Sequence, residues 1–481
     1  MPLNDITTRA NNSPNVRQPT LLASMQNSRQ RFPKRRSAEN RGDEQNTSPT
    51  AKRACMKPKP LVLVPKDTSL LCTTKPSVFE PHSIQRALRQ RGSTRIAPRD
   101  VSAIHVMSAF VSSAERAYQV SGAAGRQLPM ACRYSPSGDR LALVDEEGYI
   151  SIFDATRPGA IAPLLRWQAH EHASFDVAWN HSGTSLVSAS ADETCRLWDV
   201  ETGTKQGEFC GHSKTVRAVD WRHMDDSCFA SGSRDGGVLL WDIRSNKTRV
   251  EDIYSYRPVA NIALAHPRGH EQAARRTDRR KSIAAASSVT GLRHLHHNPH
   301  MLATSGAATA AVRVWDVRNT KQAPFESATP QDGGRGIASL ALDSDGTRIY
   351  APCNDSRIHV HNPLRVGEPI AQLHAPEFVC RGFSSGAAAS SCGRYLAAGS
   401  ATGAVVVWEL DRFGTNSSGR RAVLQGHLRD AGCVAWNPQR TQLASCADDG
   451  LMRLWDLDAD EVERGKADIA SRCRWGFAKI V

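Results

Sequence analysis

The sequence predicts an all-β fold built by repetition, and three observations indicate it. The segments 166–199 and 211–242 read alike, each with three short stretches of alternating apolar and polar residues. Turn residues separate these stretches, and each segment closes on Trp-Asp. Equivalent closing positions recur 43 to 47 residues apart, with one interval of 74, at Phe153, Trp198, Trp241, Trp315, His361, Trp408 and Trp455. A fixed period of this length is typical of repeat architectures.

The opening and the close of each repeat identify its type. A Gly-His or Ala-His pair followed about 28 residues later by Trp-Asp resembles the WD repeat, one blade of a β-propeller. Seven closing positions then imply a seven-bladed WD-repeat β-propeller. Residues 104–110 are expected to supply the outer strand that closes the ring onto the last blade, because an uncovered edge invites aggregation.

Polar residues recur at fixed places in these repeats. Within one blade, a His, a strand Ser or Thr, an Asp and the Trp can hydrogen-bond in a chain across neighbouring strands. Such buried groups are tolerated only when each has a partner. We therefore expect a structural and not a catalytic role for His170, Asp192, Trp198, His212, Asp235, His427, Asp449 and Trp455.

Four blades depart from this pattern. Phe153-Asp154 replaces Trp-Asp in the first blade, and His361-Asn362 replaces it in the fifth. Thr309 and Thr402 stand where the fourth and sixth blades would carry Asp. Apolar packing is expected to hold these blades together without the polar chain.

Charge divides the chain into two parts. Residues 1–100 carry 19 of the 62 Lys and Arg but only 7 of the 48 Asp and Glu, so the remainder is nearly neutral. The first hundred residues are rich in Asn, Ser, Thr, Pro, Arg and Gln, and cannot bury enough apolar surface to offset their ordering entropy. We expect a disordered basic N-terminal tail (1–100) before the propeller (101–481). Two basic clusters read as nuclear-import signals or as an arm that touches nucleic acid: Lys34, Arg35 and Arg36, and Lys52 and Arg53.

Cysteine usage and hydropathy bear on the compartment. Twelve cysteines are scattered without a Cys-x-x-Cys pair, which fits buried thiols in a reducing compartment. There is no apolar signal core and no run of about 18 apolar residues, so no transmembrane helix is expected. These features favour a soluble intracellular protein.

The interval of 74 residues contains a basic insertion at about 250–290. A long loop in a compact domain is usually functional or disordered, and its candidate partner-binding residues are Arg275, Arg276, Arg279, Arg280 and Lys281. A cluster of histidines at 294–300 lacks the Cys or carboxylate partners of a metal site. With no phosphate-binding loop and no nucleophile elbow, the sequence predicts neither an enzyme, nor a metal, nor a cofactor.

Two adjacent blades end in Trp-Asp-x-Arg: Trp241, Asp242 and Arg244, and Trp315, Asp316 and Arg318. This pair resembles the signature of propellers that dock on the adaptor of cullin-4 RING ubiquitin ligases. Further stretches, 141–149, 175–179, 232–236 and 342–347, are similar to the denticleless family. That resemblance covers roughly residues 125–460.

The resemblance implies a non-catalytic substrate receptor of a cullin-4 RING ubiquitin ligase. Its adaptor would be the large subunit of the damage-specific DNA-binding protein, held by Arg244 and Arg318. Its substrates would be replication-licensing and cell-cycle proteins, bound while they contact the sliding clamp PCNA on chromatin in the nucleus. No membrane partner is expected, and nucleic acid would contact only the tail. The alternative is a chromatin- or RNA-associated WD-repeat scaffold without a ligase.

Overall fold

The computed structural model describes residues 103–122, 125–157, 159–250, 253–266, 287–327, 336–382, 385–411, 414–416, 418–457 and 476–481. All of them belong to one compact unit, Thr73–Val481. The basic tail and its two clusters lie outside the described residues, as does the basic cluster at 275–281. None of the helices in the described part has the length and apolar character that a membrane span requires.

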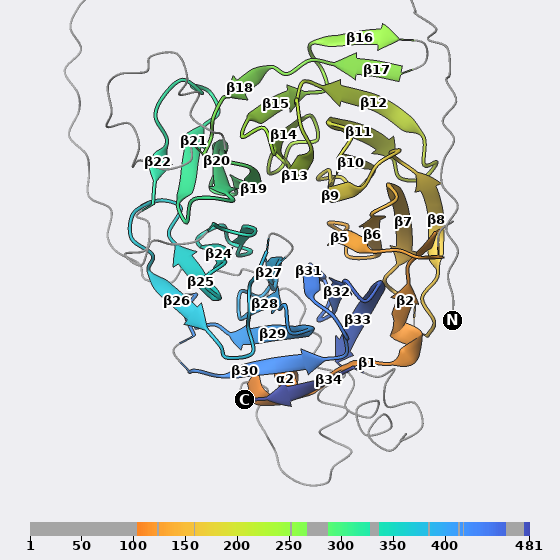
Figure 1. Ribbon diagram of the computed structural model, residues 1–481, viewed down its shortest axis with the longest axis vertical. Helices are drawn as coiled ribbons and strands as arrows, with labels where there is room; N and C mark the ends of the chain where they lie inside the picture. The colour runs from red at the N-terminus through yellow and green to blue at the C-terminus, as the bar shows by residue number, and fades with distance from the viewer. Residues whose placement is uncertain are drawn as a thin grey trace, which may run out of the picture. The chain divides into compact units, whose positions relative to one another are not determined.

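Seven blades of antiparallel strands follow one another around a ring in the described residues (Figure 1). Blade 1 comprises β5 (Pro129–Tyr134), β6 (Arg140–Asp145), β7 (Tyr149–Asp154) and β8 (Pro163–Gln168). Blade 2 comprises β9 (Ser174–Trp179), β10 (Ser185–Ser190), β11 (Thr194–Asp199) and β12 (Lys205–Cys210). Blade 3 comprises β13 (Val216–Trp221), β14 (Cys228–Ser233), β15 (Val238–Asp242) and β18 (Ala260–Ile262). Blade 4 comprises β19 (Val289–Leu295), β20 (Asn298–Gly306), β21 (Val312–Asp316) and β22 (Phe325–Glu326). Blade 5 comprises β23 (Ala341–Leu342), β24 (Ile349–Cys353), β25 (Arg357–His361) and β26 (Ala371–His374). Blade 6 comprises β27 (Ala387–Ala389), β28 (Tyr395–Gly399), β29 (Ala404–Glu409) and β30 (Arg421–Gln425). Blade 7 comprises β31 (Ala431–Trp436), β32 (Leu443–Ala447) and β33 (Leu451–Leu457). The predicted all-β, seven-bladed propeller is confirmed.

Burial along the strands explains why the ring holds together. The second strands of blades 3, 5, 6 and 7 are buried at every residue, because neighbouring blades cover both faces of each sheet. Small residues such as Ala230, Ala397 and Ala444 suit this position, where two sheets approach closely. Apolar clusters therefore lie between successive blades, and the core forms a ring around the central channel.

Residues from both ends of the propeller close the ring. β2 (Ala117–Gln119) pairs with β33 as the outer strand of blade 7, with Ala117 opposite Arg453. β1 (Phe110–Ser112) lies between β33 and β34 (Gly476–Ile480), and β34 pairs with β30 of blade 6. Blades 6 and 7 thus share one ten-stranded sheet.

The expectation of a closing strand over 104–110 was wrong. Residues Ala103–Ser108 form a short helix, α2, and the strands that close the ring begin at Phe110. Val106 and Met107 are buried in the apolar cluster of blades 6 and 7, beside Phe110. A helical turn buries both neighbouring side chains in one cluster, whereas a strand would point them to opposite faces.

An additional hairpin extends blade 2. β16 (Lys247–Val250) and β17 (Ile253–Tyr256) form it, and β17 pairs in parallel with β12 (Figure 1). The ring of Tyr256 stacks on Phe209 at 4.4 Å, directly over Gly207. A Cβ at Gly207 would lie 2.6 Å from that ring, so only glycine fits. β17 and β18 occupy the first part of the segment that the sequence marks as an insertion.

Candidate functional site

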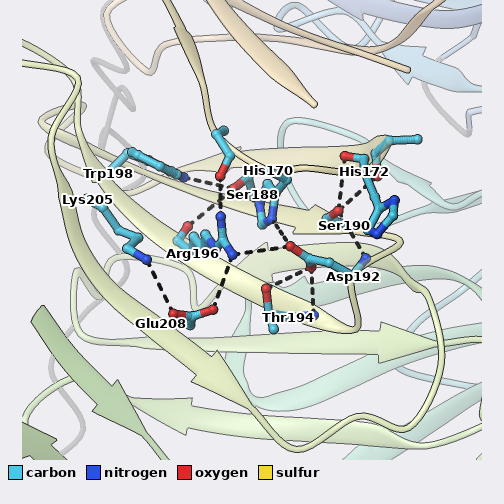
Figure 2. Close-up of polar contacts among 12 residues, drawn as sticks. His170, His172, Ser188, Ser190, Asp192, Thr194, Arg196, Trp198, Lys205 and Glu208 are labelled. Atoms are coloured by element: carbon cyan, nitrogen blue, oxygen red, sulfur yellow. Dashed lines mark hydrogen bonds and ion pairs between the residues drawn. The ribbon is translucent and has the colours of Figure 1, made fainter. Parts of the chain in front are cut away.

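The polar chain of blade 2 links β10 and β11 to His170 in the segment before β9 (Figure 2). Nδ1 of His170 contacts a carboxylate oxygen of Asp192 at 2.7 Å, and its Nε2 contacts Oγ of Ser188 at 2.7 Å. The indole N–H of Trp198 donates to the same Ser188 oxygen at 2.9 Å. Every link of the chain is made, and the His170 side chain is fully buried.

Electrostatics fix the charge states in this chain. Burial alone would raise the pKa of Asp192, but the hydrogen bond and charge of His170 hold it well below its ordinary value. Burial lowers the pKa of His170 more than Asp192 raises it. The hydroxyl that His170 contacts, Ser188, is fully buried and also holds the Trp198 indole, so the arrangement stabilises the blade.

The same chain recurs in blades 3 and 7. His212 and His427 each bridge an Asp and a Ser, and the Ser accepts the Trp N–H at 2.8 Å. The members are His212, Ser231, Asp235 and Trp241, and His427, Ser445, Asp449 and Trp455.

Blade 4 contains a polar chain that the sequence analysis missed. His266 contacts Thr304 at 3.0 Å and Thr309 at 3.2 Å, and the Trp315 indole donates to Thr304 at 3.0 Å. Thr309 therefore takes the place of the usual Asp, as its position predicts. The signal was present as Ala265-His266, but the insertion separates His266 from its strand partner by 38 residues, against 18 in blade 2.

The two Trp-Asp-x-Arg motifs adopt one geometry. In blade 3, Nε and Nη2 of Arg244 contact the two carboxylate oxygens of Asp242 at 3.0 Å each. In blade 4, the same atoms of Arg318 contact Asp316 at 3.0 and 2.7 Å. The Arg side chains are 65 % and 62 % exposed. The hydrogen bonds of Arg318 lower the pKa of Asp316 to about 2, and Arg244 likewise lowers that of Asp242.

Each Arg thus uses one edge of its guanidinium to bind its own blade. The backbone N–H groups of Arg244 and Arg318 also donate to the same carboxylates, at 2.9 and 3.0 Å, which closes a tight turn. No described residue accepts a hydrogen bond from Nη1 of either Arg. The equivalent positions of the other five blades hold Thr156, Glu201, Leu364, Asp411 and Asp458, so only blades 3 and 4 have an arginine there.

The central channel opens on the same face as these arginines. Within a blade the first and third strands run in the same direction, so the ends of β13 and β15 reach one rim. A cavity of about 400 Å³ lies at the ends of the first strands of the blades. Arg133 and Arg293 line this cavity, and they contact Asp176 at 3.3 Å and Asp220 at 3.5 Å, respectively.

Two of the histidines at 294–300, His294 and His296, line this cavity. His294 pairs with Asp220 at 3.3 Å, and His296 stacks on His223 with ring centroids 4.2 Å apart. The stacked pair and the exposed arginines face one rim, which is the candidate docking surface of the propeller.

Comparison with known proteins agrees with this architecture. The family model described as "WD domain, G-beta repeat" matches residues 162–199, 203–242 and 419–456. The β-propeller domain of Cps50 (Swd1) from Myceliophteria thermophila superposes with a TM-score of 0.53 at 18 % identity, over 71 % of this chain and 98 % of that one. At that identity the likeness concerns the fold alone.

Three relatives carry related names. "Denticleless protein homolog" from Danio rerio is 31 % identical over 73 % of this chain and 55 % of its own length. "Protein lethal(2)denticleless" from Drosophila melanogaster is 30 % identical, over 71 % and 46 %. "Denticleless protein homolog" from Homo sapiens is 28 % identical, over 73 % and 50 %. The chain therefore spans about half the length of these relatives.

Proposed function

The chain is a WD-repeat protein of the denticleless family, and from this premise we propose that it is the substrate-recognition subunit of a cullin-4 RING ubiquitin ligase. In this role it carries out no chemistry of its own. It binds the ligase adaptor with one face and brings protein substrates to the ubiquitin-transfer machinery.

The observation that carries the proposal is the repeated arginine geometry of blades 3 and 4. Two exposed guanidinium groups emerge at equivalent positions of neighbouring blades, each oriented by its own Asp. A guanidinium held in one orientation loses little entropy when it binds, and its planar donors suit carboxylates and carbonyls. Arginine is also among the residues that most often dominate interface energy.

Arg157 provides a matched control for this site. It follows the closing strand of blade 1, is 71 % exposed, and contacts Asp154 at 2.8 Å. It differs in its spacing from the closing aromatic residue and in its blade. An Arg157→Ala variant removes the same charge from the same kind of connection, and adaptor binding should stay at the wild-type level.

The test is recovery of the adaptor, the large subunit of the damage-specific DNA-binding protein, with the tagged chain from cells. Arg244→Ala combined with Arg318→Ala should abolish recovery while the propeller stays folded. Recovery at the wild-type level would remove the main physical support of the proposal. A chromatin- or RNA-associated scaffold would then be the better account.

The substrates are proposed to be replication-licensing or cell-cycle proteins, recruited while bound to PCNA on chromatin, so the protein would act in the nucleus. The basic clusters of the tail support this location by their composition. Replacement of Lys34, Arg35, Arg36, Lys52 and Arg53 by Ala should move a fluorescent fusion to the cytoplasm. An unchanged distribution would rule out these clusters as the import signals.

A further inference from the structure

The turn between β24 and β25 of blade 5 brings together three side chains of the types that bind transition metals. Cys353, Asp355 and His359 each offer one donor atom, and these atoms lie within 4.8 Å of one another. The carboxylate of Asp355 contacts Nε2 of His359 at 2.9 Å. Cys353 is fully buried and the His359 side chain is 2 % exposed, whereas Asp355 is 26 % exposed.

Blade 2 shows what this turn normally contains. Ser190 stands two residues before Asp192, where its oxygen accepts the Asp192 N–H at 3.2 Å. Arg196 stands four residues after Asp192 and contacts its carboxylate at 3.4 Å. Blade 5 keeps the carboxylate but has Cys353 at the Ser position and His359 at the Arg position. A hydroxyl and a guanidinium, which are poor zinc ligands, are thus both replaced by good ones.

Blade 5 also lacks the Ser and Trp members of the polar chain that is found in blade 2. Ala351 stands where blade 2 has Ser188, and His361 stands where it has Trp198. Within the described part of the chain, Nδ1 of His359 and both ring nitrogens of His361 are buried without a hydrogen-bond partner. Blade 5 therefore lacks the Trp–Ser–His links that tie the strands of blades 2, 3 and 7 together.

We propose that this turn binds one zinc ion through Cys353 Sγ, an Asp355 carboxylate oxygen and a His359 ring nitrogen. Zinc lies about 2.3 Å from sulfur and about 2.0–2.2 Å from nitrogen and oxygen ligands. The three donor atoms lie within 4.8 Å of one another, so an ion placed centrally among them is already at nearly these distances from each atom. Each side chain would therefore move by less than about 1 Å to bind it.

Charge balance favours a divalent cation in this position. The thiol of Cys353 is fully buried, and its sulfur lies within 4.8 Å of a carboxylate oxygen of Asp355. When Zn²⁺ binds, the thiol proton is released to solvent and a Zn–S bond forms. Thiolate and carboxylate together neutralise the two charges of the ion, and a buried site tolerates a neutral assembly best. The exposed side of Asp355 gives water access to the fourth position.

The site would be structural, because three protein ligands from one turn would hold β24 and β25 together where the polar chain is missing. It is independent of adaptor docking, since the residues lie in blade 5 and the Trp-Asp-x-Arg motifs lie in blades 3 and 4.

The experiment uses the full chain without a histidine tag. Metal is stripped with a chelator, Zn²⁺ or Co²⁺ is added, and excess is removed by dialysis. We expect one zinc per chain by mass spectrometry, and a Co²⁺ spectrum with a thiolate charge-transfer band and tetrahedral d–d bands. Less than a tenth of an equivalent of zinc, or no thiolate band, would overturn the proposal.

Two variants restore the residues of blade 2 and so should fold. Cys353→Ser and His359→Arg should each lower zinc affinity on the order of 100-fold or more, because loss of even a supporting residue costs roughly 10–100-fold. Cys195→Ser, which changes a fully buried thiol in blade 2, should keep the metal. Undiminished zinc binding in both restoring variants would also overturn the proposal.

Discussion

Arg244 contacts Asp242, two residues before it, through two parallel hydrogen bonds of 3.0 Å. The carboxylate thereby fixes the orientation of an exposed cation that would otherwise sample many rotamers. In Asp242→Ala the charge of Arg244 remains but its orientation is lost. We expect adaptor affinity to fall about tenfold, within the range that the loss of a charge-assisted pair allows. Surface plasmon resonance with the purified adaptor measures this.

Asp154→Ala supplies the control for that variant, because it releases Arg157 of blade 1 in the same way. Its affinity for the adaptor should equal that of the wild type. Equal losses in the Asp154 and Asp242 variants would indicate a general effect on the rim and would contradict an orienting role for Asp242.

Trp241 tests the structural reading of the polar chains. It is 2 % exposed and donates to Ser231 at 2.8 Å. Trp241→Ala removes a buried aromatic ring and a hydrogen bond, and should lower the free energy of unfolding by about 3–5 kcal/mol. Trp198→Ala and Trp455→Ala should behave alike. Chemical denaturation followed by fluorescence measures the loss, and a Trp241→Ala protein as stable as the wild type would contradict the blade assignment.

Acid should destabilise the propeller through two buried histidines. Burial, with nearby Arg313, lowers the pKa of His266 to about 3, and burial, with nearby His359, lowers that of His361 to about 4. Both values lie below the unfolded value of about 6.5, so the unfolded chain binds more protons as the pH falls below 6.5. The contribution of these histidines to the free energy of unfolding is therefore fully present above about pH 6.5. Below that pH it should decline by at most about 1.4 kcal/mol per pH unit for each group.

His361→Phe separates this effect from general acid unfolding. Denaturant titrations between pH 7.5 and 5.0 should show a shallower loss of stability for the variant than for the wild type. Identical pH profiles would show that His361 does not contribute.

The tail should be dispensable for folding, because the strands that close the ring begin at Phe110. Deletion of residues 1–100 should leave the thermal midpoint within a few degrees. Deletion of residues 1–120 also removes β1 and β2, exposing the edges of β33 and β34, and should yield aggregates. Scanning calorimetry distinguishes the two, and aggregation of the shorter deletion would contradict the closure described here.

The repeat pattern predicted the seven blades because each Trp-Asp or its substitute closes a strand with a strong local signal. It could not predict that β34 lies between β30 and β1, since short edge strands carry no distinct periodicity and their partners are far away in sequence. The hairpin β16–β17 was missed for the same reason. His266 was overlooked because its partner Thr304 lies beyond a long insertion, outside the spacing that identifies the other histidines.

The site residues likewise divide into those that local sequence spacing predicts and those that it does not. The ion pairs of Arg244 and Arg318 follow from the spacing Asp-x-Arg, which a tight turn after a strand makes local. Cys353 and His359, in contrast, attract attention only when the blades are superposed and their positions are seen to match Ser190 and Arg196.

The most direct test of the ligase-receptor account is adaptor binding by the Arg244→Ala, Arg318→Ala double variant. Both side chains are exposed, so the thermal midpoint should stay within about 2 °C of the wild type. Affinity for the purified adaptor should fall on the order of a thousandfold, as expected for two interface anchors, while the Arg157→Ala control keeps wild-type affinity. Wild-type affinity in a folded double variant would contradict the account.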